Sequence, residues 1–241
     1  MTEIVDTKKS VFIGIGCSSA IAREVLHKLP PYDIVVLFSR STGRVSVGGC
    51  DVDFTIYDSS SIETLQQLVE NPQLPSKRDA CRVDIVSFLG AKDNAAFINQ
   101  TSDQIFNVIN VNLALNSMFS SLLIKKYLGT AISIVFLSSS GALAGDAGVT
   151  MYSATKHALN GLSKGIAMEY GRYGVNANVL ALGVVSVGMS SEVSQKRLSE
   201  MVKRSANRKP VEVLSITSSL VFLLSNKDIN GTMLACDGGF L

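Results

Sequence analysis

Residues 131–156 have the sequence AISIVFLSSSGALAGDAGVTMYSATK, which joins a predicted buried strand to the start of a predicted helix. The run 131–137 is apolar and rich in β-branched residues, as is typical of a buried strand. From Tyr152 onward the apolar residues recur with helical spacing, so Tyr152 and Lys156 share one helix face. Ser139 lies at the predicted end of the strand, thirteen residues before Tyr152. These three side chains are candidates for one site.

The chemistry of this trio points to a carbonyl or an alcohol. A free tyrosine has a pKa near ~10, and a cation close to its oxygen lowers that pKa. The result is a proton donor and acceptor for carbonyl reduction or alcohol oxidation, while Ser139 can hydrogen-bond the substrate oxygen. Tyrosine and lysine four residues apart also occur as a half-buried ring and a solvated cation. Evidence from the rest of the chain is therefore needed to choose between a catalytic pair and an ordinary helix face.

Outward from this stretch, predicted strands and helices alternate along the chain. This alternation predicts an α/β fold, a single doubly wound Rossmann-type domain spanning residues 1–241. We expect a mostly parallel, about seven-stranded sheet with helices on both faces. The predicted strands are 10–15, 33–38, 52–56, 84–89, 132–137, 177–182 and 232–236, and the predicted helices are 20–29, 60–70, 102–127, 151–173, 193–205 and 211–224.

Composition excludes several classes of protein. A hydrophobic content of 46% with 17% charged residues is not that of a disordered chain. The net charge of +2 and the absence of a Lys/Arg run predict no nucleic-acid surface. The four cysteines are far apart without a CxxC pair, which favours reduced thiols and no metal site. No apolar run long enough to span a bilayer and no signal peptide were recognised, so we expect a cytoplasmic protein without a membrane partner.

The turn after the first predicted strand is a candidate nucleotide site. Gly14 and Gly16 permit a tight turn and close approach of phosphates, and Ser18 and Ser19 are good N-cap residues. A helix N-terminus there can hold a pyrophosphate. The second predicted strand ends at Ser39 and Arg40, without a carboxylate for the ribose hydroxyls. Arg44 lies nearby. A cation at this position suits a 2′-phosphate, so NADP(H) is favoured as cofactor, with NAD(H) as the alternative.

With these motifs in order, the chain resembles the short-chain dehydrogenase/reductase family over nearly its whole length, in particular its 3-oxoacyl-thioester reductases. Asn112, Ser139, Tyr152 and Lys156 match the family's catalytic Asn, Ser, Tyr and Lys. The end of the chain matches the family's closing strand at Gly231, Asp237, Gly238 and Gly239. The resemblance implies that Ser139 polarises the carbonyl, Tyr152 gives it a proton, Lys156 lowers the tyrosine pKa and binds the nicotinamide ribose, and Asn112 positions a water that links Lys156 to solvent.

The chain departs from the family pattern along the cofactor. Ala20 and Ala22 replace two glycines of the first turn, Ser87–Gly90 replaces an NNAG motif, Thr55 replaces an aspartate that contacts adenine, and Val187 replaces a threonine that binds the nicotinamide. The catalytic quartet is complete, which favours an active divergent enzyme. By the resemblance, the cofactor is expected along Gly14, Gly16, Ser18, Ser19, Ala20, Ile21, Ser39, Arg40, Thr55, Ile56, Leu89, Gly90, Tyr152, Lys156, Gly183 and Val185.

The substrate is expected at the carboxyl ends of the strands, on a loop and helix over about 184–205. Gly145, Asp146 and Met151 are predicted to form the other wall. The lining suits a small-molecule ketone or a 3-oxoacyl thioester, the latter attached to an acyl carrier, and a keto-sugar stays open. Relatives of this kind are commonly homotetramers or homodimers, and the apolar residues of 102–127 allow either a second subunit or a single broad core face.

Two other functions compete with a carbonyl reductase. A non-catalytic subunit or scaffold with a degenerate cofactor site is consistent with the replaced glycines, but the intact Ser139, Tyr152 and Lys156 oppose it. An epimerase or dehydratase on the same fold is less favoured, since such relatives usually carry a longer substrate domain after the last strand.

Overall fold

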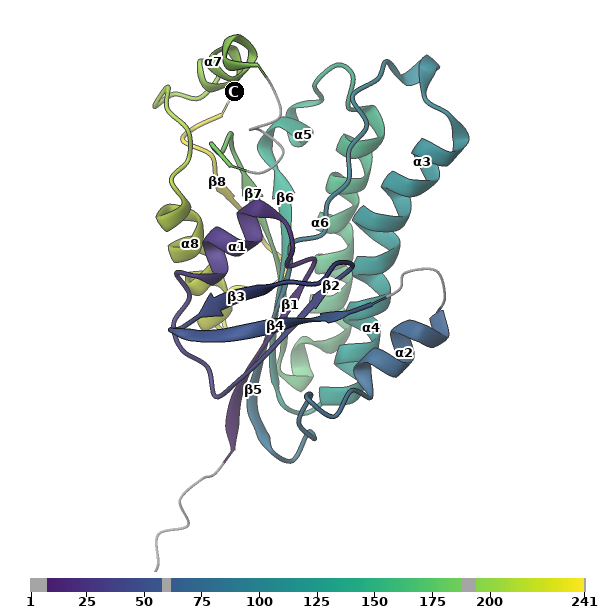
Figure 1. The fold of residues 1–241 in the computed structure, drawn as a ribbon, viewed down its shortest axis with the longest axis vertical. Coiled ribbons are helices and arrows are strands. Elements are labelled where there is room, and N and C mark those ends of the chain that lie inside the picture. Colours follow the sequence, from purple (N-terminus) through teal and green to yellow (C-terminus); the bar gives the residue numbers. More distant parts are fainter. Residues whose placement is uncertain (1–7, 58–61, 188–193, 241) are drawn as a thin grey trace, which may run out of the picture.

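An eight-stranded sheet forms the centre of the molecule (Figure 1). The computed structural model describes residues 8–57, 62–187 and 194–240, and the sheet order within them is β3-β4-β2-β1-β5-β6-β7-β8. Every neighbouring pair is parallel except β3 with β4. The strands are β1 (Lys9–Ile15), β2 (Ile34–Ser39), β3 (Arg44–Val47), β4 (Cys50–Ile56), β5 (Ala80–Ser87), β6 (Ala131–Ser139), β7 (Val175–Leu182) and β8 (Met233–Cys236). The predicted α/β fold with a mostly parallel sheet is confirmed.

Helices cover both faces of this sheet, α1 and α8 on one and α2, α4 and α6 on the other (Figure 1). The helices are α1 (Ala20–Leu26), α2 (Ile62–Val69), α3 (Ser102–Ile109), α4 (Leu115–Tyr127), α5 (Ser140–Ala144), α6 (Thr150–Tyr170), α7 (Gln195–Val202) and α8 (Val213–Ser225). Two predicted helices begin outside the described residues: residues 60 and 61 of the helix 60–70 and residue 193 of the helix 193–205. The short helix α5 was not predicted from the sequence.

Strand β1 shows how the two apolar layers form. Its successive side chains point to opposite faces, so Val11 and Ile13 join the core beneath α4 and α6, whereas Phe12 joins the core beneath α1 and α8. All three are fully buried. Burial of each such side chain contributes roughly 1.5–3 kcal/mol to folding. The continuous apolar run of the strand is thus explained by helices on both faces.

The extra strand β3 corrects the predicted number of seven strands. It forms a hairpin with β4, in which Val47 pairs with Cys50 across Gly48 and Gly49. Both glycines have positive φ values, 57° and 85°, which the favoured two-residue hairpin turn requires. The Gly-Gly pair was therefore a hairpin signal in the sequence that the prediction did not use.

The predicted continuous helix over 102–127 contains a π-helical segment, η2 (Asn110–Ala114), between α3 and α4. Thr101 begins α3 with a capping box, in which its hydroxyl and the Gln104 side chain each bond the other residue's backbone N–H. A π-bulge inserts one extra residue in a turn and is often found at functional sites. Here it holds Asn112, one of the predicted catalytic residues.

The combined segment Ser102–Tyr127 also revises one expectation from the sequence. At 26 residues it is long and apolar enough, by length and composition, to cross a membrane. Half of its most apolar window is nevertheless buried within the fold. Phe119, Leu123 and Tyr127 are fully buried in the core under the sheet. This is also the pattern of a core helix that covers a sheet.

The chain reverses its direction of travel across the sheet between β1 and β5. From β1 it goes outward through β2 and β4, then crosses to β5 on the other side of β1. Ligands of open α/β sheets bind at such switch points, beyond the carboxyl ends of the strands. At this edge Gly16, with a φ of 77°, lies so close to Leu89 that a Cβ at position 16 would come within 3.1 Å of the Leu89 backbone nitrogen.

Candidate active site

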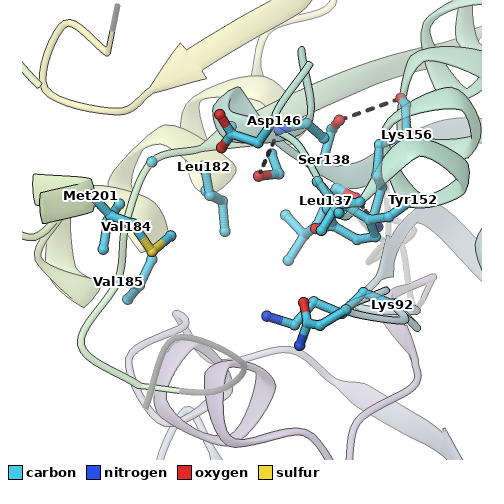
Figure 2. Close-up of a pocket in the computed structure, with 18 of the residues that line it drawn as sticks. Lys92, Leu137, Ser138, Asp146, Tyr152, Lys156, Leu182, Val184, Val185 and Met201 are labelled. Atoms are coloured by element: carbon cyan, nitrogen blue, oxygen red, sulfur yellow. Dashed lines mark hydrogen bonds between the residues drawn. The ribbon is translucent and has the colours of Figure 1, made fainter. Parts of the chain in front are cut away.

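A cavity of about 480 Å³ opens beyond the carboxyl ends of β5, β6 and β7. Figure 2 shows Leu137, Tyr152 and Lys156 on one side of it and Leu182, Val184, Val185 and Met201 across from them, with Lys92 reaching toward the space between. Ser139 lines the same cavity. The structure thus brings Ser139, Tyr152 and Lys156 together.

Lys156 places its ammonium deep in this site. The residue is only 3% exposed, and its Nζ donates hydrogen bonds to the backbone oxygens of Leu89 at 2.9 Å and Leu137 at 2.8 Å. Burial lowers the pKa of Lys156 to about 8. An ammonium has three N–H donors, and the two carbonyls take two of them. One donor is left for a ligand in the cavity.

The pKa of Tyr152 departs from the expectation. Burial raises the pKa of Tyr152 above its ordinary value, and the hydrogen bond with Ser139 acts in the lowering direction. Lys156 Nζ lies 5.9 Å from the centre of the tyrosine ring and is bonded to Leu89 and Leu137 instead. Burial, rather than the charge of Lys156, therefore sets the direction of the shift in the Tyr152 pKa. A tyrosine protonated at neutral pH is suited to donate its proton.

Three consecutive serines lie where β6 ends and α5 begins, and their hydroxyls have different partners. Ser138 donates to the backbone oxygen of Lys156 at 3.3 Å, and Ser140 donates to a carboxylate oxygen of Asp237 at 2.6 Å. Ser139 caps α5 by accepting from the Ala142 N–H at 3.4 Å and also contacts the Tyr152 hydroxyl. The geometry favours Ser139 over its neighbours as the serine that acts with Tyr152.

Asn112 lies one layer behind the cavity and is fully buried. Its side-chain amide accepts from the Ala91 N–H at 2.7 Å and donates to the Ala91 oxygen and to the Thr155 hydroxyl, both at 2.9 Å. Its backbone oxygen accepts from the Asn116 side chain at 2.8 Å. Asn112 therefore ties the π-helical segment to the loop after β5 and to the residue before Lys156. The expected water between Asn112 and Lys156 stays a prediction.

The predicted cofactor residues fall into two groups. Those that line the cavity are Ile21, Leu89, Gly90, Tyr152, Lys156, Gly183 and Val185. Those that lie outside the cavity, in β1, at the first turn or at the ends of β2 and β4, are Gly14, Gly16, Ser18, Ser19, Ala20, Ser39, Arg40, Thr55 and Ile56. The cavity thus covers the end of the expected cofactor site next to Tyr152.

The first turn tolerates both alanine replacements. Ala22 is fully buried in the core beneath α1, so its methyl group is part of the packing. Ala20 is exposed at the start of α1, where its methyl meets solvent. Ser19 caps the helix by accepting from the Ala22 N–H at 3.3 Å, and Gly16 keeps the positive φ of a tight turn. This turn and the remaining donor of Lys156 fit a dinucleotide with one ribose beside the lysine.

The ends of β2 and β4 give mixed support to the expected adenosine contacts. Ser39 is fully buried, and its hydroxyl accepts from the Ser41 N–H at 3.2 Å. Thr55 donates its hydroxyl to Gln73 at 2.9 Å. Arg40 and Ile56 are exposed. Of the predicted residues here, these two side chains are the ones exposed to a ligand.

The second cation expected near this end has another partner. Arg44 lies in β3 and makes a bidentate ion pair with Asp53 of β4, at 2.6 and 2.9 Å. Both side chains are largely exposed, so solvent screens the pair and it contributes little to stability. The carboxylate nonetheless offsets the charge of Arg44, which leaves Arg40 as the better candidate for a phosphate.

The substrate side agrees in part with the sequence. The cavity includes Val184, Val185, Val187, Ser194, Arg197 and Met201 from the predicted loop and helix, while residues 188–193 lie outside the described residues. Asp146 lines the cavity as predicted, but Gly145 and Met151 do not, and Gly148 and Val149 take their place. The prediction also missed Lys92 and Phe240. Their only sequence signal is position, since each follows a strand that ends at this edge.

The described residues 8–57, 62–187 and 194–240 contain no candidate metal-binding site. No three His, Cys, Asp or Glu side chains within them are grouped as metal ligands. All four cysteines are free thiols.

Comparison with known proteins identifies the family of this chain. The sequence profile of the family described as enoyl-(acyl carrier protein) reductase matches residues 47–241. The 3-oxoacyl-(acyl-carrier-protein) reductase FabG of Buchnera aphidicola is 25% identical, covering 97% of this chain and 98% of its own.

Solved structures share the fold. A putative 2-deoxy-D-gluconate 3-dehydrogenase from Agrobacterium tumefaciens with bound NADP superimposes with a TM-score of 0.80, at 18% identity and 96% coverage of both chains. A 4-hydroxyisoleucine dehydrogenase complexed with NADH gives 0.77, at 21% identity over 95% of this chain and 97% of the other. The profile match, over most of the chain, places this protein in the short-chain dehydrogenase/reductase family of NAD(P)-dependent oxidoreductases, as a divergent member.

Proposed function

We propose that this protein is a carbonyl reductase that uses NADP(H) and reduces a ketone or a 3-oxoacyl thioester to a secondary alcohol, or catalyses the reverse. The observation that carries the proposal is the arrangement of Ser139, Tyr152 and Lys156 on one side of a cavity of about 480 Å³. The buried ammonium of Lys156 supports it, because a charged group is costly to bury without a function or a strong partner.

In the reduction direction, Ser139, Tyr152 and Lys156 have different roles. Ser139 donates a hydrogen bond to the substrate carbonyl oxygen, and Tyr152 transfers its hydroxyl proton to the same oxygen. When bound, the nicotinamide cofactor would supply the hydride that ends on the carbonyl carbon. Tyr152 is left as a phenolate, which the nearby charge of Lys156 stabilises until a proton returns from solvent. Burial raises the pKa of Tyr152 and so disfavours the phenolate, a cost that the charge of Lys156 offsets in part.

NADP(H) is proposed over NAD(H) because of Arg40. This exposed cation follows the end of β2, where a carboxylate would favour NAD(H). Arg40→Ala is expected to weaken NADPH binding about tenfold and to leave NADH binding nearly unchanged. Arg44→Ala is the matched control, because Arg44 is already paired with Asp53. Equal losses in the two variants would contradict the assignment to Arg40.

A homo-oligomer in the cytoplasm is the proposed state of the enzyme. Phe106 on α3 and Met168 on α6 are large apolar side chains that are 68% and 86% exposed, and they are candidates for a contact with a second subunit. The free thiols of all four cysteines are consistent with a reducing compartment. Light scattering of the purified protein tests the assembly, and a monomer at micromolar concentration would contradict it.

The decisive test of the reaction is turnover by wild type and by Tyr152→Phe. Oxidation of NADPH is followed by absorbance with acetoacetyl N-acetylcysteamine, cyclohexanone and acetophenone as carbonyl substrates. Tyr152→Phe is expected to lose at least about a hundredfold in turnover, since it lacks the proton donor. Tyr173→Phe, in an exposed turn at the far end of α6, is the matched control. A Tyr152→Phe protein as active as wild type would refute the mechanism.

The competing function is a non-catalytic subunit. It gains support from Ser39 and Thr55, whose hydroxyls are bonded to neighbouring residues. If no carbonyl compound is reduced by a folded protein and Tyr152→Phe still binds the same cellular partner, the subunit is the better account.

A further inference from the structure

The segment that follows β8, residues Asp237–Phe240, forms part of the cavity wall without a role in the proton transfer. Asp237 organises this segment. One of its carboxylate oxygens accepts from the N–H groups of Gly239 at 2.9 Å and Phe240 at 3.3 Å. The other accepts from the hydroxyl of Ser140 at 2.6 Å. The segment is thereby fixed to the residue next to Ser139.

The neighbouring segment after α7 holds the other side of this wall. The N–H groups of Ala206 and Asn207 donate to the backbone oxygens of Gly239 and Gly238, at 2.9 and 3.1 Å. Ser205 and Phe240 form an isolated antiparallel bridge. These backbone bonds fix residues 238–239 against residues 206–207, and specificity-determining side chains are best placed on such a supported segment.

The ring of Phe240 is held by a cation. The Arg204 guanidinium lies 4.6 Å from the ring centre, within range of a cation–π interaction, and the same guanidinium is paired with Asp146. Phe240 and Asp146 both line the cavity. The ring is therefore oriented from outside the cavity by Arg204 and contributes an apolar surface to it.

The rest of the wall across from Tyr152 is mostly apolar, although Arg197 of α7 also lines the cavity. Figure 2 shows Leu182, Val184, Val185 and Met201 on that side. Ser194 also lines the cavity, but its hydroxyl caps α7 by accepting from the Arg197 N–H at 3.3 Å. A polyhydroxylated substrate would exchange its hydrogen bonds to water for contacts with these apolar side chains. Each hydroxyl left unpaired would cost binding free energy.

From these contacts we infer that Phe240 is a specificity-determining residue, which selects carbonyl compounds carrying an aryl or acyl group over polyhydroxylated sugars. The inference rests on the proposed carbonyl reductase and names the class of its substrate. The group attached to the carbonyl packs against the Phe240 ring and the apolar wall, while the carbonyl oxygen meets Ser139 and Tyr152. Aromatic contacts of this kind contribute beyond simple burial of apolar area.

The chain itself offers a direct probe, because it contains no tryptophan. Phe240→Trp keeps an aromatic ring beneath Arg204 and makes the indole emission report on this wall alone. Acetophenone is titrated into this variant, with and without NADP⁺, and D-fructose serves as the polyhydroxylated comparison. Tyr173→Trp, exposed at the far end of α6, is the matched control for nonspecific quenching.

A saturable change with acetophenone in Phe240→Trp, absent in Tyr173→Trp and absent with fructose, is the expected result. A change of equal size in both variants, or saturation by fructose alone, would overturn the inference. Titration with NADPH in the same sample tests the proposed function separately. If NADPH does not bind but the emission change with acetophenone saturates, the cofactor proposal fails while the inference about Phe240 is kept. If NADPH binds but acetophenone does not, the inference about Phe240 fails while the cofactor proposal is kept.

Steady-state kinetics give a second readout that does not depend on the reporter. Phe240→Ala is expected to raise KM for acetophenone about tenfold with kcat within about threefold, and Phe240→Leu is expected to fall between Phe240→Ala and wild type. An unchanged KM in Phe240→Ala, or a loss confined to kcat, would contradict a contact with the substrate. Should the alanine variant fail to fold, the leucine variant decides by the same split.

Discussion

The buried ammonium of Lys156 makes the stability of this protein depend on pH in a way that a single substitution can remove. The pKa of Lys156 falls from its ordinary 10.5 to about 8 because burial disfavours the charged form. At about 1.4 kcal/mol for each pKa unit, the charged lysine costs the folded state about 3 kcal/mol. Lys156→Met removes the charge while keeping a side chain of similar length.

The direction follows from proton binding in the two states. The unfolded chain holds the Lys156 proton up to a pH near 10.5, whereas the folded chain begins to release it near 8. Between these values the unfolded state binds more protons, so the free energy of unfolding rises with pH. The cost is fully present below the folded pKa and disappears as pH passes the unfolded pKa. Between about pH 7 and about pH 9.5, wild type should gain about 2 kcal/mol relative to Lys156→Met.

The assay is urea unfolding of both proteins at the two pH values. Comparing slopes is better than comparing stabilities at neutral pH, because Lys156→Met also leaves the carbonyls of Leu89 and Leu137 without their donor, a loss of about 1–3 kcal/mol. Lys164→Met, at an exposed position of the same helix, should follow wild type. Parallel pH profiles for wild type and Lys156→Met would show that Lys156 is not buried as a charge, and the argument would fail.

Three further predictions test other parts of the site. Ser139→Ala should lower turnover about a hundredfold and Ser138→Ala less than about tenfold, in the NADPH oxidation assay; equal losses would contradict the choice of serine. Asn112→Ala should lower the free energy of unfolding in urea by about 2–4 kcal/mol, because its fully buried side chain makes three hydrogen bonds; a change under about 1 kcal/mol would place it outside the packed site. Gly183→Ala should cost about 1–3 kcal/mol in the same assay and raise KM, since its Cβ would lie 2.7 Å from the Asp237 Cα; a stable variant with unchanged KM would show that this segment can move freely.

Much of the fold followed from local patterns in the chain. The continuous apolar run of β1 requires cover on both faces, and its alternating side chains Ile13 and Phe12 enter different cores. Lys156 and Tyr152 lie four residues apart on one helix, which was enough to predict that both line one cavity. The hairpin of β3 and β4 was also encoded locally, in Gly48 and Gly49, but its signal was not used.

The rest depends on contacts between distant parts of the chain. The direction of the Tyr152 pKa is set by burial, and the partners of Lys156 are carbonyls that end two separate strands. Nothing near Phe240 in the sequence shows that Arg204 holds its ring or that it lines the cavity. Likewise, the commitment of Thr55 to Gln73 requires the packing after α2 to be known.

Calorimetric titration with NADPH and NADH in parallel tests the central claim most directly. The account predicts NADPH binding with a dissociation constant on the order of micromolar, weaker binding of NADH, and loss of most NADPH affinity in Lys156→Met. Absence of heat from either nucleotide in a folded sample would contradict the claim that this cavity serves a nicotinamide-dependent reductase.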